Sequence, residues 1–456
     1  MNKKKIFIAD KASGFEGSSF LTSVCASSIA LYNKSNRFKF PFWGGMLDKS
    51  SSLFSEWIQQ TEYKKEAEDI LDYINKRKGL EYFKKFKERM IDIAQKFDDY
   101  SQKLRKELGD LDDRELVDKY EKFIIRYQKD FAPGIITFLY ESILSEKLMQ
   151  SLLARDKKSA SLLEGLLSNG YKSFMIKSEE ALLKIKLEKN KDKKEKLINS
   201  YLNKFFYIEA NYNTAPVIDR EYVLDRVKEV KRHQDIKARK IRIDLLSWEK
   251  QVVELLKITE VIRDKRKYIN LVGSYLMDRF LDEIVIRRKI DSKVARRSFW
   301  YEYKDLMSNA NEMMVKLKKR NSVSFVFDGK DVLCLEYSAL KIRTNNSNKA
   351  EELLGTPASS GCYIGTVRKI MSREDFGKMK EGDILLTTMT RPEFVPLIKK
   401  AGAVITEEGG LTCHAAIVSR EMSIPCIVGI SNITEILKDG DRIKVDADNG
   451  TIKIIK

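Results

Sequence analysis

The chain has 456 residues, of which 33% are charged and 43% hydrophobic, a balance that favours a helix-rich globular protein over a disordered one. No run approaches the roughly 20 apolar residues of a membrane span, and the length leaves room for two to four domains. The net charge of +18 is unevenly placed. Residues 355–456 contain 14 Lys+Arg and 13 Asp+Glu, so the first 354 residues hold +17. A basic body predicts a protein partner, nucleotide phosphates or nucleic acid, although a generally Lys-rich composition explains the charge equally well.

The cysteine pattern and the N-terminal sequence both indicate the cellular compartment of the protein. The five cysteines show no CxxC spacing and no even framework, which indicates a reducing cytoplasm and no structural metal. The N-terminal apolar run is interrupted by Asp10, Lys11 and Glu16, which argues against a signal peptide. We therefore expect a cytoplasmic protein with no metal site and no membrane association.

The chain begins with an N-terminal segment of uncertain fold, residues 1–50. Within it, Lys3–Ala9 alternates weakly like a strand and Pro41–Gly45 reads as a break. From Ser55 to Ala295 the apolar spacing is helical, so we expect a large helical body over residues 51–342.

Several local signals refine this body. Asp112-Asp113 is typical of a helix cap, and Pro133 is typical of a first helical turn. The charge-dense stretch Lys184–Leu197 predicts the solvated end of a helical hairpin; nucleic-acid contact is a weaker alternative because no aromatic residues interleave. The pattern of residues 322–337 predicts a β-hairpin, and the polar residues 343–354 predict a linker.

After Gly355 the pattern changes to short β runs between glycines, with a tight turn at Asp448-Asn449-Gly450. The predicted strands are Cys362–Ile370, Asp383–Thr388, Ala403–Thr406, Cys426–Val428, Arg442–Asp446 and Thr451–Ile455, and the predicted helices are Pro392–Ala401 and Ala415–Met422. This pattern of short strands and helices predicts a separate α/β module over residues 355–456.

The stretch Gly409–Arg420 carries one of only two histidines in the chain. Gly409 and Gly410 allow a sharp turn and close approach to an anion, and His414 falls in the first turn of the helix that follows. The helix dipole there favours a phosphoryl group by ~0.3–1 kcal/mol and disfavours an imidazolium, so the ring is kept neutral and nucleophilic. Thr412 and Thr406 supply hydroxyls that would orient the ring or bond a phosphoryl oxygen.

A lone histidine at a helix start is ordinarily a cap or core residue, and here the twin glycines, the hydroxyl and the small-residue helix together favour phosphoryl transfer. The backbone around Cys413 and Ala415 belongs to the same predicted phosphate-binding loop; Cys413 fits small-residue packing better than a reactive thiol. Arg391 would approach the phosphoryl group or lie on the surface as an ordinary arginine. His233, flanked by charge, fits a surface residue better than an acceptor-site base.

This module resembles the phosphohistidine swivelling domain of phosphoenolpyruvate-utilising enzymes, the family of phosphoenolpyruvate synthase, pyruvate phosphate dikinase and the rifampicin phosphotransferases. The resemblance rests on four stretches besides the histidine motif: Gly355–Gly365, Gly382–Pro392, Ile424–Gly429 and Val445–Gly450. It implies a multidomain α + α/β protein, in which a large helical body is followed by a C-terminal β/β/α swivelling domain. His414 matches the family's phosphorylated histidine, and Thr412 matches a family threonine.

The chain departs from the family in what precedes the module. Family enzymes usually carry an ATP-grasp domain there, whereas residues 55–295 read as helices. The order of helical body and histidine domain is similar to that of rifampicin phosphotransferases, whose helical body binds the acceptor. We therefore expect no intrinsic cofactor, Mg-ATP on a separate ATP-grasp protein acting in trans, and an unidentified small-molecule acceptor on the body.

Two other hypotheses stay open. The module would serve as a docking element in a non-catalytic binding or regulatory protein, which the lack of a recognisable nucleotide domain favours. The basic helical body would alternatively bind nucleic acid, the weakest of the three interpretations, and that predicts strongly salt-dependent association.

Overall fold

The structure of the chain is a computed structural model. It describes residues 7–16, 21, 27–29, 31–33, 38, 43–48, 53–58, 60–76, 79–155, 167, 171–211, 214–230, 244–320, 322–327, 332–335, 340–342, 352–371, 373–390, 394–410, 413–430 and 433–455. The predicted site residues Thr412 and Arg391, as well as His233, lie outside the described residues, as does the predicted linker up to residue 351.

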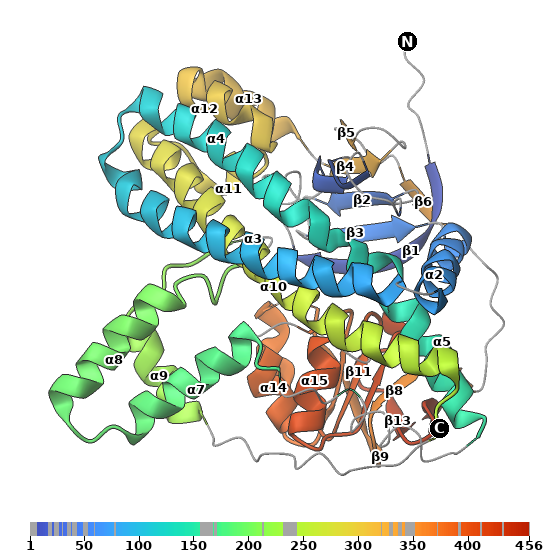
Figure 1. Cartoon of the computed structure of the whole chain (residues 1–456). Helices are drawn as coiled ribbons and strands as arrows, with labels where there is room; N and C mark the ends of the chain where they lie inside the picture. Colours follow the sequence, from blue (N-terminus) through green and yellow to red (C-terminus); the bar gives the residue numbers. More distant parts are fainter. Residues whose placement is uncertain are drawn as a thin grey trace.

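A helical body precedes the C-terminal module, which we define as residues 352–455 (Figure 1). The helices of the body are α2 (Gln60–Asn75), α3 (Gly79–Glu107), η1 (Leu108–Asp110), α4 (Asp113–Phe131), η2 (Ala132–Leu139), α5 (Glu141–Leu153), α7 (Phe174–Leu187), α8 (Lys191–Lys204), α9 (Arg220–Glu229), α10 (Ser247–Arg288), α11 (Ser292–Ala295), η3 (Trp300–Glu302), α12 (Tyr303–Ser308) and α13 (Ala310–Lys319). The predicted helical body is therefore present, although its first helix begins at Gln60, because residues 53–58 form a strand where helix was expected from Ser55.

Helix α10 is the central element of the body and packs against α3, α4 and α5. Its 42 residues bury apolar side chains on more than one face, because other elements surround it. Gly273 permits a close contact with α4, since a Cβ there would lie 2.3 Å from the ring of Tyr127. The Tyr127 hydroxyl donates to Oδ1 of Asn270 at 2.7 Å and so satisfies both buried polar groups.

Local sequence signals account for several helix boundaries. The side chain of Asp112 accepts from the backbone N–H of Glu115 at 2.8 Å and forms a capping box, which confirms the predicted cap. Pro133 lies in the first turn of η2, a 3-10 helix. Helices α7 and α8 pack together around the short turn after Leu187, so the predicted helical hairpin is confirmed.

Both ends of the body meet in one six-stranded sheet, ordered β5-β4-β2-β3-β1-β6. Its strands are β1 (Phe7–Glu16), β2 (Trp43–Asp48), β3 (Leu53–Ile58), β4 (Ser322–Phe327), β5 (Val332–Leu335) and β6 (Leu340–Ile342). The predicted hairpin corresponds to β4 and β5, which pair antiparallel. Strand β2 pairs with β4 antiparallel, and β1 pairs with β6 in parallel, so the N-terminal segment joins the hairpin although more than 250 residues of chain separate β3 from β4.

The C-terminal module contains an eight-stranded mixed sheet ordered β7-β14-β13-β9-β10-β11-β12-β8. Its elements are β7 (Glu352–Leu354), β8 (Thr356–Ser359), β9 (Cys362–Lys369), η4 (Arg373–Lys378), β10 (Ile384–Thr387), α14 (Val395–Lys400), β11 (Ala403–Thr406), α15 (His414–Glu421), β12 (Cys426–Val428), α16 (Ile433–Ile436), β13 (Arg442–Asp446) and β14 (Thr451–Ile454). All six predicted strands and both predicted helices are present, within a few residues of their expected ends.

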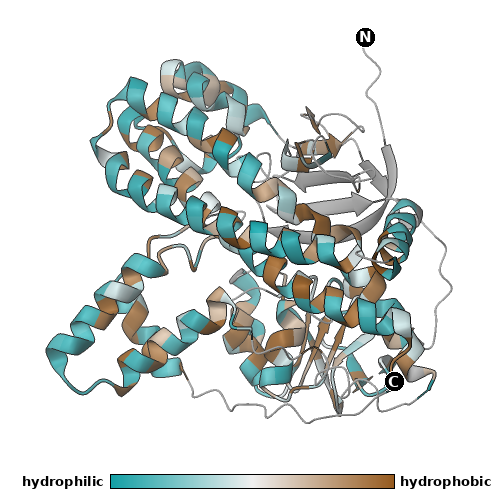
Figure 2. Cartoon of the chain, viewed as in Figure 1, coloured by the Kyte–Doolittle hydropathy of each residue, from teal (hydrophilic) through white to brown (hydrophobic). Residues whose placement is uncertain are grey.

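The parallel strands β9, β10, β11 and β12 form the half of the sheet that carries the helices. The side chains of β10, β11 and β12 are buried and mostly apolar, as expected for strands covered on both faces, whereas most of β9 is only partly buried or exposed. Figure 2 shows hydrophobic residues along the central strands of the module, while the long helices of the body carry many hydrophilic residues. Among the described residues, no helix is long and apolar enough to cross a bilayer.

Candidate functional site

The histidine loop, residues 407–413, connects the end of β11 to the first turn of α15. Helix α15 begins at His414, and Cys413 is its N-cap, whose Sγ accepts from the backbone N–H of Ala416 at 3.4 Å. Because β11 is a parallel strand between β10 and β12, the loop lies at the carboxyl edge of the strands, where α/β sheets usually bind ligands.

The two glycines of the loop lie in different structural environments. Gly409 has a φ of +114°, and a Cβ there would lie 2.7 Å from Sγ of Cys413, so only glycine fits. Gly410 faces the helical body instead. A Cβ built on it would lie 3.5 Å from Cα of Ser142 and 3.5 Å from Oγ of Ser145, both on α5. The loop is therefore in direct contact with the body.

The His414 ring is half-buried and is held by one hydroxyl. Oγ1 of Thr390, in the loop after β10, lies 2.8 Å from Nδ1 of His414. Since Nδ1 is engaged, Nε2 is the ring nitrogen left for chemistry. The ring is thus fixed at one nitrogen by a buried hydroxyl.

Positive charge surrounds this ring. Burial, with added repulsion from Lys267 and then Arg263 on α10, lowers the pKa of His414 to about 3. Arg263 forms an ion pair with Glu141 at the start of α5. Burial and the neighbouring Arg263 and Arg266 lower the pKa of Lys267 to about 8. The imidazole is therefore neutral at physiological pH and faces cations that would stabilise a phosphoryl group.

The other predicted site residues lie as follows. The Thr406 hydroxyl is buried and donates to the carbonyl of Glu408 at 2.5 Å, which tightens the start of the loop. Burial raises the pKa of the Cys413 thiol, which fits the packing role rather than a reactive thiolate. Ala415 is buried in the first turn of α15.

Three residues of the site were not identified from the sequence: Thr390, Lys267 and Arg263. Thr390 belongs to the stretch Gly382–Pro392, where several threonines look alike in sequence. Lys267 and Arg263 are spaced i, i+4 and therefore share one helix face, but the helix is rich in charge and nothing local indicates which face meets the module.

A second group of polar side chains lies at the edge of the module. Cys362, Asp446 and Asp448 bring a thiol and two carboxylates within 4.8 Å of one another. Asp448 accepts from the backbone N–H of Gly361 at 2.9 Å, and Asp446 accepts from the backbone N–H of Asn449 at 3.1 Å. Both carboxylates therefore serve as hydrogen-bond acceptors for backbone N–H groups at this turn. Among the described residues of this group, nothing else indicates a metal site.

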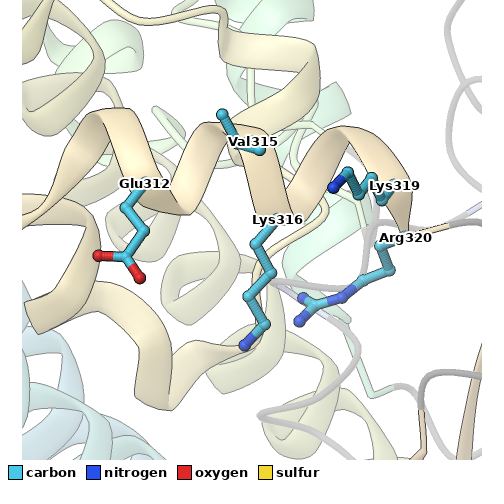
Figure 3. Close-up of a pocket in the computed structure, with 5 residues that line it drawn as sticks. All are labelled: Glu312, Val315, Lys316, Lys319 and Arg320. Carbon is cyan, nitrogen blue, oxygen red and sulfur yellow. The ribbon is translucent and has the colours of Figure 1, made fainter.

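A pocket of about 560 Å³ lies in the body along α13, and none of its lining residues belongs to the module. It is lined by Glu312, Val315, Lys316, Lys319 and Arg320 (Figure 3). Lys316 and Arg320 both form ion pairs with the buried Glu302, so two lining residues of this pocket belong to an ion-pair network.

Comparison with known proteins identifies the module. Residues 379–450 match the mobile domain of PEP-utilising enzymes. The matched stretch contains Thr390, the histidine loop and α15, and it ends at Gly450 in the turn between the last two strands. The part of the site that belongs to the module therefore lies within the stretch that matches the mobile domain, while Lys267 and Arg263 lie outside it.

Individual relatives agree with this assignment. The chain is 39% identical over 145 residues to a probable phosphoenolpyruvate synthase of Archaeoglobus fulgidus, covering 29% of this chain and 19% of that protein. It is 42% identical over 129 residues to the phosphoenolpyruvate synthase of Pyrococcus furiosus, covering 28% and 16%. It is 32% identical over 181 residues to the rifampicin phosphotransferase of Bacillus cereus, covering 40% and 19%.

The chain therefore spans less than a fifth of the length of these relatives. The match to rifampicin phosphotransferase covers 40% of the chain, which is more than the whole C-terminal module contains. Similarity to that protein thus extends past the module into another part of the chain.

Proposed function

We propose that this chain is a phosphotransferase component that carries a phosphoryl group on Nε2 of His414. The observation that carries the proposal is the His414 ring itself, neutral, held at Nδ1 by Thr390 and facing Lys267 and Arg263 across the contact between module and body. The match to the mobile domain of PEP-utilising enzymes supports it.

The loading step uses one tautomer of the ring. When Nδ1 carries the proton and donates it to Oγ1 of Thr390, the lone pair of Nε2 is free to attack phosphorus. The N–P bond forms while the P–O bond to the nucleotide breaks, and the leaving oxygen departs with the nucleotide product. Thr390 thereby selects the nucleophilic tautomer and fixes the plane of the ring.

The unloading step takes place where the module contacts the body. A hydroxyl oxygen of the acceptor attacks phosphorus, the electron pair of the N–P bond returns to Nε2, and the hydroxyl proton passes to solvent. Because Nδ1 keeps its proton, the ring leaves as neutral imidazole, which the nearby cations favour. Lys267 and Arg263 offset the charge of the transferring group, as cationic side chains do in phosphoryl transfer.

The donor in this proposal is a separate ATP-grasp protein that holds Mg-ATP and meets His414 in trans. The helical fold of residues 60–320 supports this arrangement, because the described part of that region contains helices and turns instead of the strand-rich pattern of an ATP-grasp domain. The acceptor then binds on the body beside α5 and α10. Similarity to a rifampicin phosphotransferase beyond the module supports an acceptor-binding body of that general kind.

Isotope transfer tests the proposal. The chain is incubated with labelled ATP, with and without a candidate ATP-grasp protein, and acid-labile label is located by peptide mapping at alkaline pH. Label is expected on His414 in the complete mixture, and it is expected to be lost in His414→Asn. If no mixture labels His414 while the donor protein turns over ATP, the proposal is contradicted.

A further inference from the structure

The contact between the histidine loop and α5 leaves one buried hydroxyl without a partner. Oγ of Ser145 lies 3.5 Å from the Cβ position of Gly410, and the side chain is 0% exposed. Among the described residues, no group bonds that hydroxyl. Leaving a buried hydroxyl without a hydrogen bond is unfavourable, so a native structure ordinarily supplies a partner.

The start of α5 adds an electropositive end to the same place. Ser142 and Ser145 lie in the first two turns of this 13-residue helix, and its N-cap residue, Tyr140, makes no side-chain capping bond. The N-terminus of a helix carries the positive end of its dipole and favours anions. The histidine loop approaches this end directly through Gly410.

The facing helix α10 contributes a charge without a counter-ion. Within the described part of the chain, Lys267 has no ion pair and no hydrogen bond. Its neighbour Arg263 is paired with Glu141, and the ring of His414 is neutral. The junction thus holds an excess of positive charge, an orphan hydroxyl and a helix N-terminus around a ring that accepts phosphate in the proposed function.

We propose that the junction of the histidine loop with α5 and α10 is a binding site for a phosphoryl dianion, and that the bound dianion latches the C-terminal module onto the helical body. Lys267 and the hydroxyl of Ser145 are its side-chain ligands. The latch rests on the proposed function, since the dianion is then the phosphoryl group on His414. Free inorganic phosphate has the same chemistry and occupies the site without any transfer.

The latch gives the movement of the module a direction. A loaded module is held against the body, because its dianion satisfies Lys267 and Ser145. Once the acceptor has taken the phosphoryl group, the junction again has unmatched positive charge and a buried hydroxyl without a partner, and the module is released. Transfer of the phosphoryl group to the acceptor therefore weakens the contact between the histidine loop and the body.

Hydrogen exchange of the full-length chain tests the site. Amides in residues 141–145 and 406–410 are followed in the free chain, with inorganic phosphate, and after chemical phosphorylation of His414 by phosphoramidate. Phosphorylation is expected to slow their exchange about tenfold or more, because hydrogen bonds to charged groups are strong. Inorganic phosphate is expected to give a smaller, saturable protection.

Two lysine variants separate the ligand from general charge. Lys267→Gln is expected to abolish the protection given by phosphate and by phosphorylation. Lys250→Gln, an exposed lysine about five turns away on the same helix, is expected to retain both. Loss of protection in both variants would show a nonspecific charge effect and would overturn the site.

Disulfide trapping gives an independent measure of docking. Cα of Ser142 lies 3.5 Å from the Cβ position of residue 410, close enough for a disulfide between the two positions. In a Cys413→Ser background, Gly410→Cys with Ser142→Cys, which leaves Ser145 in place, is expected to cross-link faster after phosphorylation of His414. Unchanged exchange and unchanged cross-linking on a phosphorylated chain would refute the latch and leave the transfer proposal standing. Failure of His414 to accept phosphate would contradict the transfer proposal, while protection by inorganic phosphate would still support the site.

Discussion

Oγ1 of Thr390 lies 2.8 Å from Nδ1 of His414, although the two residues are 24 positions apart. The bond joins the loop after β10 to the first residue of α15, across the carboxyl edge of neighbouring parallel strands. The bond engages Nδ1, and when Nδ1 is the donor the other ring nitrogen, Nε2, carries the free lone pair. The orientation of the histidine ring therefore depends on a residue outside its own motif.

Removing this hydroxyl should slow the loading of His414. Thr390→Val keeps the shape of the buried side chain and loses the bond, whose net value of about 0.5–1.5 kcal/mol corresponds to a rate loss of roughly two- to tenfold. Thr390→Ser keeps the hydroxyl and should retain most of the rate. The measurement is the initial rate of acid-labile label on His414. Equal rates in all three proteins would remove Thr390 from the site.

The His414 ring should not titrate in the range usual for histidine. Its pKa is lowered to about 3 by burial, by Lys267 and by Arg263, so the ring resonances should stay constant from pH 8 to pH 5. NMR of a His233→Gln chain isolates this single histidine. Lys267→Gln should move the pKa of His414 upward, and Lys250→Gln should leave it alone. A midpoint near 6.5 in the unmodified site would contradict the electrostatic description.

The same shift has a consequence for stability. The unfolded chain takes up a proton on His414 as the pH falls through 6.5, whereas the folded chain does not until the pH approaches 3. This residue therefore contributes stability that is fully present above pH 6.5 and is lost as the pH falls toward 3. In urea unfolding, His414→Gln should show a weaker decline of the midpoint between pH 6.5 and pH 4 than the parent chain. An identical decline in both proteins would contradict the assignment.

The twin glycines should respond differently to the same substitution. Gly409→Ala forces a side chain into a φ of +114° and within 2.7 Å of Sγ of Cys413, so it should destabilise the module by about 1 kcal/mol or more. Gly410→Ala meets α5 at ordinary contact distances and should be close to neutral. Thermal unfolding of the two variants measures this difference. Equal losses would show that the loop has another conformation.

The sequence was most informative where structure is local. Strands such as Ala403–Thr406 and the helix starting at His414 were predictable because short apolar runs between glycines and a capped helix depend on neighbours in the chain. The cap at Asp112 was predictable for the same reason. These features define the module and its histidine.

The long-range features were not predictable from local pattern. Strand β1 pairs with β6 across the whole helical body, and nothing within Phe7–Glu16 indicates that partner. Lys267 is one lysine among many on a charged helix, and its electrostatic interaction with His414 arises only in the folded chain. Pairing of distant elements is a property of the whole fold.

The ion pairs beneath the α13 pocket should matter for stability rather than for transfer. Glu302 and Arg320 have side chains only 4% and 2% exposed, and Glu302→Gln leaves the arginine buried without its counter-charge. We expect a loss of about 3–5 kcal/mol. Lys316→Gln removes a partner whose side chain is 49% exposed and should cost less than about 1 kcal/mol. Denaturant midpoints compare the two variants, and a milder effect for Glu302→Gln would contradict the buried network.

The most direct test of the central claim is to look for phosphate on His414 in the chain as its own cells make it. The protein is isolated under alkaline conditions that preserve phosphohistidine, and its peptides are analysed by mass spectrometry at neutral to alkaline pH. A peptide containing residues 409–420 that carries one acid-labile phosphoryl group on His414 is the predicted result. A fully unmodified His414 in that material, together with no phosphorylation of His414 by phosphoramidate in the purified chain, would contradict the account.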